Sequence, residues 1–144
     1  MNRPFGTIIL KTFCRYITPF ILLYGIYVLI HGEFSPGGGF QAGAVLAFAV
    51  ILGRLVQGDG ARVNMSGNLG ILTAAGGGLI FAAVGLMSIP FGGHLFNYGV
   101  YPLNMPADEM HPLGILGIEV GVTLCVMGVI IAIFDALTRK DELL

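Results

Sequence analysis

Residues 112–137 read PLGILGIEVGVTLCVMGVIIAIFDAL, and this apolar stretch decides the fold class of the chain. Roughly 20 helical residues, at about 1.5 Å of rise each, cross the hydrocarbon core of a bilayer. Three further apolar stretches are long enough to do the same, at about 12–30, 36–55 and 69–89. The sequence therefore predicts an all-α, integral membrane bundle of four transmembrane helices that forms a single domain over residues 1–144.

The composition of the whole chain agrees with a bilayer as its solvent. Hydrophobic residues make up 56% of the chain and charged residues only 10%, whereas soluble domains carry about 25% charged residues. So little polar surface cannot cover a water-soluble globule, and we expect lipid around the helices. No basic run suggests a nucleic acid as a partner.

The positions of the basic residues predict the orientation of the chain. With four spans, the amino terminus, the middle loop and the carboxyl terminus share one side of the membrane. Those regions and the helix ends beside them hold all seven basic residues, which are Arg3, Lys11, Arg15, Arg54, Arg62, Arg139 and Lys140. Because basic residues concentrate on the cytoplasmic side, we expect both termini in the cytoplasm and the protein in a prokaryotic cell (inner) membrane.

Local signals mark the helix boundaries. Ser35 is a good N-cap, and Pro36 suits the first turn of the second span, where a missing N–H costs nothing. Pro112 suits the start of the fourth span in the same way. Near the other end of that span, Asp135 and Arg139 are four residues apart, a spacing at which we expect an ion pair.

The most unusual local feature is the run SPGGGFQAG at 35–43. Each glycine costs about 1 kcal/mol relative to alanine inside a helix, so three in a row need compensation. Bare backbone allows another helix to approach closely. Alternatively, exposed amides at a helix start hold an anion or water in an ion path. Both interpretations stay open for this glycine-rich helix start, Pro36, Gly37, Gly38, Gly39 and Phe40.

A second glycine triplet, Gly76-Gly77-Gly78, lies in the middle of the third span. Glycines at such a place either loosen the helix or allow tight packing against a neighbour. We expect packing.

Glu119 is a carboxyl group inside the fourth span, roughly 10 Å below its outer end. A charge near the membrane centre costs on the order of 3 kcal/mol. On a helical projection Glu119 points about 140° away from Gly114 and lies on the same side as Thr123. In a lone bundle the face opposite a glycine seam would meet lipid, so we expect another protein to cover Glu119.

Two roles are open for this carboxyl group. Glu119, with Thr123 beside it, is a candidate for an ion path or a proton relay, as intramembrane carboxyl groups often are. Alternatively, Glu119 forms a structural hydrogen bond to a neighbouring helix. The chain shows no nucleophile–base arrangement, no metal-ligand spacing and no cofactor motif, and we expect neither an enzyme nor a metal or cofactor site.

The run GEFSPGGGFQAG at 32–43 resembles the hallmark of the B subunit of Mrp-type multisubunit sodium/proton antiporters. Related subunits of membrane-bound hydrogenase-like complexes share this resemblance. The stretch LGIEVG at 116–121 is similar to the family's last helix, with its carboxylate at Glu119. The resemblance maps the family's glycine motif onto Pro36–Phe40.

The resemblance implies a non-catalytic membrane subunit of a multisubunit cation (sodium)/proton antiporter, or of the antiporter-like module of a redox-driven ion-pumping complex. Other membrane subunits would be its partners, and sodium and protons the transported ions. Glu33 stands where the family often has His, and Gln41 replaces an aliphatic residue common in antiporter versions. Both departures raise the chance of a hydrogenase-like or other related host complex over a standard antiporter. The alternatives are a purely structural assembly subunit and a small independent homo-oligomeric transporter.

Overall fold

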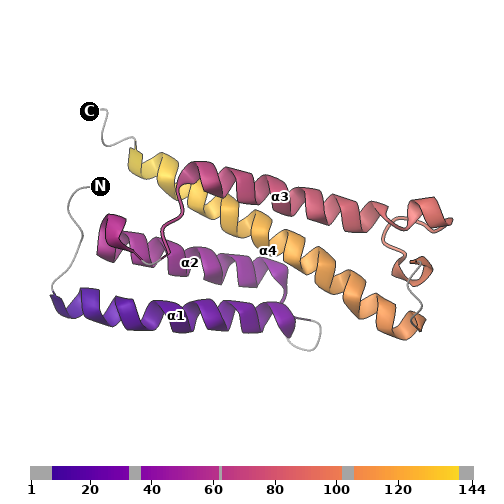
Figure 1. Cartoon of the computed structure of the whole chain (residues 1–144), viewed down its shortest axis with the longest axis horizontal. Helices are drawn as coiled ribbons and strands as arrows, with labels where there is room; N and C mark the ends of the chain where they lie inside the picture. Colours follow the sequence, from indigo (N-terminus) through magenta and orange to yellow (C-terminus); the bar gives the residue numbers. More distant parts are fainter. Residues whose placement is uncertain (1–7, 33–36, 62, 102–105, 140–144) are drawn as a thin grey trace.

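The computed structural model describes residues 8–32, 37–61, 63–101 and 106–139. Its four long helices are α1 (Ile8–Ile30), α2 (Gly39–Gln57), α3 (Gly67–Leu86) and α4 (Ala107–Arg139), and Figure 1 shows their arrangement. Short 3₁₀ turns, Gly58–Gly60, Ile89–Phe91 and Tyr98–Val100, lie in the connections. Each long helix is apolar and long enough to cross a membrane. The predicted all-α fold with four membrane spans is confirmed.

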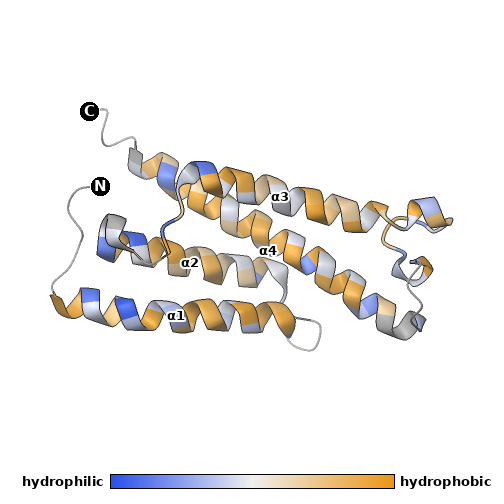
Figure 2. Ribbon diagram, viewed as in Figure 1, coloured by the Kyte–Doolittle hydropathy of each residue, from blue (hydrophilic) through white to orange (hydrophobic). Residues whose placement is uncertain are grey.

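The helices lie in a row. α1 packs mainly against α2, α2 lies between α1 and α4, and α3 packs against α4 (Figure 1). Consecutive helices run in opposite directions, so that α2 and α4 are parallel neighbours (Figure 1). In this arrangement α4 has α2 on one side and α3 on the other. Apolar residues predominate along all four helices, as Figure 2 shows, and many large apolar side chains are exposed.

The contact between α3 and α4 is made by glycine backbones. A Cβ atom added at Gly77 would lie 2.5 Å from both the amide nitrogen of Cys125 and the carbonyl oxygen of Gly121. A Cβ atom at Gly76 or Gly78 would meet nothing within 4 Å. The prediction that the triplet serves packing is confirmed for its middle residue, whereas its two neighbours face away from α4.

The start of α2 differs from the predicted start at Pro36. The helix begins at Gly39, and its N-cap is Gly38, which has a φ of 116° and provides no side-chain hydrogen bond. A positive φ costs glycine little because glycine has no Cβ. Gly37 and Gly38 therefore precede the helix, and only Gly39 of the run belongs to its first turn. Ser35 and Pro36, the predicted cap and first residue, lie outside the described residues.

The other helix ends also differ from their predicted positions, but these differences matter less for the fold. α4 begins at Ala107, so that Pro112 lies inside the helix and not at its start. The one backbone hydrogen bond that a proline removes does not end a helix that neighbours support. α1 already begins at Ile8, before the predicted residue 12, and α3 ends at Leu86, before the predicted residue 89.

Candidate functional site

Glu119 on α4 faces the start of α2, and the two features predicted separately form one site. A Cβ atom added at Gly38 would lie 3.4 Å from Oε1 of Glu119, and one at Gly32 would lie 2.8 Å from Oε2. The carboxyl group thus lies between the end of α1 and the start of α2. Its side chain is half-buried within this single chain.

The expectation that a second protein must cover Glu119 is wrong. The helical projection places Glu119 correctly, away from the glycine contact with α3. In the row of helices, however, that side of α4 is occupied by α2 of the same chain. α4 is packed on two sides, and both partners are helices of this chain. The position of Glu119 therefore gives no ground for a multi-chain assembly, which needs other support.

Beside the carboxyl group the backbones of α2 and α4 touch directly. A Cβ atom at Gly39 would collide with the backbone of Glu119, and one at Gly43 would lie 2.6 Å from the carbonyl oxygen of Thr123. The buried Thr123 hydroxyl donates to the carbonyl oxygen of Gly39 at 3.0 Å. The same hydroxyl lies 2.7 Å from the carbonyl oxygen of Glu119. Thr123 therefore ties the first turn of α2 to α4.

The remaining residues of the glycine motif are placed differently. Gly37 packs against α1, because a Cβ atom there would lie 3.2 Å from the carbonyl oxygen of Val28. Phe40 is 67% exposed. Pro36 lies outside the described residues. The structure thus brings Gly38 and Gly39 together with Glu119 and Thr123, places Gly37 against α1, and leaves Phe40 at the surface.

The electrostatics of the α2 start suit a carboxylate. The first N–H groups of a helix have no partner inside the helix and form the positive end of its dipole. A carboxylate at this end contributes about 0.3–1 kcal/mol, and up to about 2 kcal/mol where it is partly buried. The Gly38 N-cap brings no side-chain hydrogen bond of its own. Glu119, on a neighbouring helix, brings its carboxyl group to this end of α2, with Oε1 3.4 Å from the position of a Cβ atom added at Gly38.

A pocket of about 110 Å³ opens beside Glu119. Its other lining residues are apolar and come from the end of α1 and the start of α4, namely Ile30, Pro112, Leu113, Ile115 and Leu116. The volume accommodates a few water molecules. Glu119 is thus the polar group of an apolar pocket. Across the described ranges, no three His, Cys, Asp or Glu residues gather in a way that could hold a metal ion.

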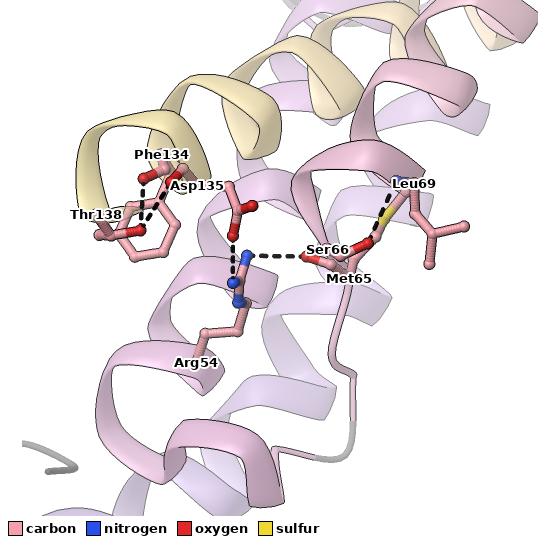
Figure 3. Close-up of polar contacts among 7 residues, drawn as sticks. All are labelled: Arg54, Met65, Ser66, Leu69, Phe134, Asp135 and Thr138. Carbon is pink, nitrogen blue, oxygen red and sulfur yellow. Dashed lines mark hydrogen bonds and ion pairs between the residues drawn. The ribbon is translucent and has the colours of Figure 1, made fainter. Parts of the chain in front are cut away.

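Sequence reasoning missed an ion pair at the other end of the α2–α4 contact. Nη2 of Arg54 lies 2.6 Å from Oδ1 of Asp135, and Nη1 donates to the carbonyl oxygen of Met65 at 2.9 Å (Figure 3). The guanidinium also lies over the ring of Phe134, 5.5 Å from its centroid. No local spacing links Arg54 to Asp135. The side chain of Arg139 lies outside the described part, so its pairing with Asp135 stays a prediction.

Asp135 also lies at the start of α3. A Cβ atom at Gly67, the first residue of α3, would lie 2.6 Å from Oδ2 of Asp135. Ser66 caps the same helix by accepting a hydrogen bond from the amide of Leu69 (Figure 3). α4 therefore places Glu119 at the positive end of α2 and Asp135 at the positive end of α3. Sequence alone offered no signal for this arrangement beyond the two acidic residues.

Four apolar helices with carboxyl groups held inside their packing define a multi-pass membrane protein. A family described as "Domain related to MnhB subunit of Na+/H+ antiporter" matches residues 9–132. The chain belongs to this family. The resemblance drawn from the glycine motif and the last helix is thereby confirmed.

Individual relatives span nearly the whole chain. The B subunit of the Na(+)/H(+) antiporter of Bacillus subtilis (strain 168) is 28% identical over 129 residues, which cover 83% of this chain and 90% of the relative. The relative from Staphylococcus haemolyticus (strain JCSC1435), which carries the name of an antiporter subunit, mnhB2, is 29% identical over 91% of this chain and 94% of its own length. The corresponding Na(+)/H(+) antiporter B subunit of Alkalihalophilus pseudofirmus is 26% identical over 150 residues, which cover 97% of this chain and 98% of the relative.

Proposed function

We propose that the chain is a non-catalytic membrane subunit of a multisubunit sodium/proton antiporter in a prokaryotic cell (inner) membrane. Family membership over most of the chain supports this proposal. Relatives named as the B subunits of Na(+)/H(+) antiporters are also similar to this chain along nearly their full length. Its partners are then other membrane subunits, and the transported ions are sodium and protons.

Within this complex we assign Glu119 and the start of α2 to the ion path. The supporting observation is that the carboxyl group lies at the positive end of α2 and also opens on a pocket with room for water. A proton or cation that arrives through the pocket neutralises the carboxylate and removes its attraction to the α2 start. The glycine run, without side chains, allows that start to shift. Thr123 keeps the first turn attached to α4.

Substitution of Glu119 tests this role. We expect Glu119→Ala to assemble with the partner subunits and to lose most sodium-dependent proton transport, measured in everted membrane vesicles. Glu119→Gln separates the two interpretations because it retains hydrogen bonding but cannot titrate. Loss of transport in the Gln variant supports titration, whereas full activity in that variant assigns Glu119 to structure. Thr73→Val on the exposed side of α3 is the matched control and should transport normally.

A redox-driven ion-pumping complex is a second candidate host. Glu33 and Gln41 in the glycine motif favour it, because both depart from the antiporter pattern. Purification of the intact complex from native membranes, with identification of the chains that co-purify, distinguishes the hosts. Hydrogenase-type iron–sulfur subunits would indicate the redox-driven complex. Large antiporter-like chains without them would indicate the antiporter, and recovery of this chain alone would indicate a homo-oligomer.

A further inference from the structure

A second pocket, of about 70 Å³, lies between α1 and α2 at the opposite end of these helices from Glu119. Its lining residues are Arg15, Thr18, Pro19, Leu22, Gly53, Gln57 and Val63. Gly53 contributes to the space because it has no side chain, and a Cβ atom there would meet only the Cβ of Ala61, at 3.7 Å. The role proposed for Glu119 does not use this pocket.

The depth of the pocket in the membrane follows from its lining. Gln57 is the last residue of α2 and lines the same pocket as Arg15. Arg15 therefore lies at the level where α2 leaves the hydrocarbon, while the preceding turns of α1 continue beyond it. Pro19 and Leu22 are further along α1, toward the membrane centre. The pocket thus has a polar rim at the lipid headgroups and an apolar wall at the acyl chains.

The cationic side of the pocket suits a phosphate. Arg15 is exposed and carries five N–H donors in a planar fork that matches phosphate oxygens. Lys11 lies one helical turn away, rotated by about 40° on the helix, and is not among the residues that line the pocket. Both residues belong to the end of the molecule where the basic residues of the chain concentrate.

The backbone of the pocket adds an acceptor. Pro19 lies inside α1 and has no N–H, so the carbonyl oxygen of Arg15 loses its usual helical donor. The Thr18 hydroxyl does not replace that donor, since it binds the carbonyl oxygen of Cys14 at 2.7 Å. Without that helical bond, this carbonyl oxygen can accept a hydrogen bond from water or from a lipid headgroup. A headgroup that combines a phosphate with a hydroxyl group matches both the guanidinium and this carbonyl oxygen.

From this complementarity we propose that the pocket binds an anionic phospholipid whose headgroup carries hydroxyl groups, of the phosphatidylglycerol class. The phosphate contacts Arg15, a headgroup hydroxyl donates to the carbonyl oxygen of Arg15 or to Gln57, and an acyl chain lies along Pro19 and Leu22. The apolar wall selects a lipid over a free phosphate ion. The proposal is independent of the role of Glu119.

Native mass spectrometry of the full-length chain, released from the purified complex, tests this site. Phosphatidylglycerol and phosphatidylcholine are offered at equal concentration, and the ratio of bound species is measured. We expect a preference for phosphatidylglycerol of about fivefold or more, since one basic residue near an anionic headgroup contributes that much. Arg15→Gln should reduce the ratio to near one. Lys11→Gln, with the same charge change on the same helix but outside the lining, should keep most of it.

One further variant and a competition with inorganic phosphate complete the test. Gly53→Leu fills the pocket without changing any charge and should also abolish the preference, which covers the case that Arg15→Gln does not fold. Equal losses in the Arg15 and Lys11 variants would overturn the proposal in favour of diffuse attraction. Displacement of the lipid by millimolar inorganic phosphate would overturn it in favour of a free-anion site. No preference in the wild-type chain would refute it outright.

Discussion

At the scale of single residues, Thr123 has the most specific contact at the candidate site. Its hydroxyl reaches from α4 to the carbonyl oxygen of Gly39, the first residue of α2. Thr123→Val keeps the shape but leaves that carbonyl group without the hydroxyl. We expect a loss of about 1 kcal/mol in the free energy of unfolding, measured by SDS or thermal denaturation in mild detergent.

Thr123→Ser is the matched control for this prediction. It retains the hydroxyl, so its free energy of unfolding should lie closer to that of the wild type. A Val variant as stable as the wild type would contradict the prediction, because it would show that the hydroxyl makes no net contribution. The helical projection placed Thr123 beside Glu119, but it could not show that the hydroxyl reaches another helix.

Asp135 contacts two groups at once, the guanidinium of Arg54 and the start of α3. The side chains of Arg54 and Asp135 are only 19% and 11% exposed. Removing one partner of a buried pair leaves an uncompensated charge and costs about 3–5 kcal/mol. We expect Asp135→Asn and Arg54→Gln each to destabilise the chain strongly, and less than additively when combined, in unfolding measurements.

The charge-reversed double variant, Arg54→Asp with Asp135→Arg, gives a sharper result. If the ion pair were the whole interaction, exchanging the charges would restore stability. Because the α3 start also favours a negative charge at residue 135, we expect the exchange to recover only part of the loss. Full recovery would contradict the assignment of Asp135 to the start of α3.

At the scale of the helices, glycines that are neighbours in sequence have opposite roles. Gly77 meets the α4 backbone, whereas Gly78 faces open space. We expect Gly77→Ala to force α3 and α4 apart and to destabilise the chain. Gly78→Ala should have no such cost and should favour the helix by about 1 kcal/mol. The test compares the free energies of unfolding of the two variants, and Gly77→Ala should be the less stable one. The reverse order would contradict the close contact of Gly77 with α4.

At the scale of the whole molecule, the orientation in the membrane stays a prediction. The seven basic residues favour cytoplasmic termini. A fluorescent protein fused to the carboxyl terminus should therefore fluoresce, and alkaline phosphatase inserted in the connection between α3 and α4 should be active. Phosphatase activity at the carboxyl terminus would refute the orientation and would place the proposed lipid site in the other leaflet.

The row of helices also bears on assembly. α1 and α3 lie at the two ends of the row. In the most apolar stretches of these two helices, 22% and 17% of the residues are buried, compared with 44% in α2. Large apolar faces therefore remain for lipid or for other subunits. The support for a multi-chain complex comes from the family, and not from the position of Glu119.

The sequence by itself determined what depends on composition and on spacing along one helix. It predicted four apolar spans, the direction in which Glu119 points, and the family from the glycine motif. The sequence predicted the helix starts less accurately, as at Gly39, because proline and capping signals also fit a loop that leads into a helix.

Only the tertiary structure decided which helix lies beside which. A helical projection gives the direction of a side chain but not the neighbour in that direction, and four helices can pack in a bundle or in a row. The row places α2 against Glu119, joins Arg54 to Asp135 across 81 positions of sequence, and sets Gly77 against α4. Such contacts depend on the close approach of backbones far apart in the chain, which no local pattern encodes.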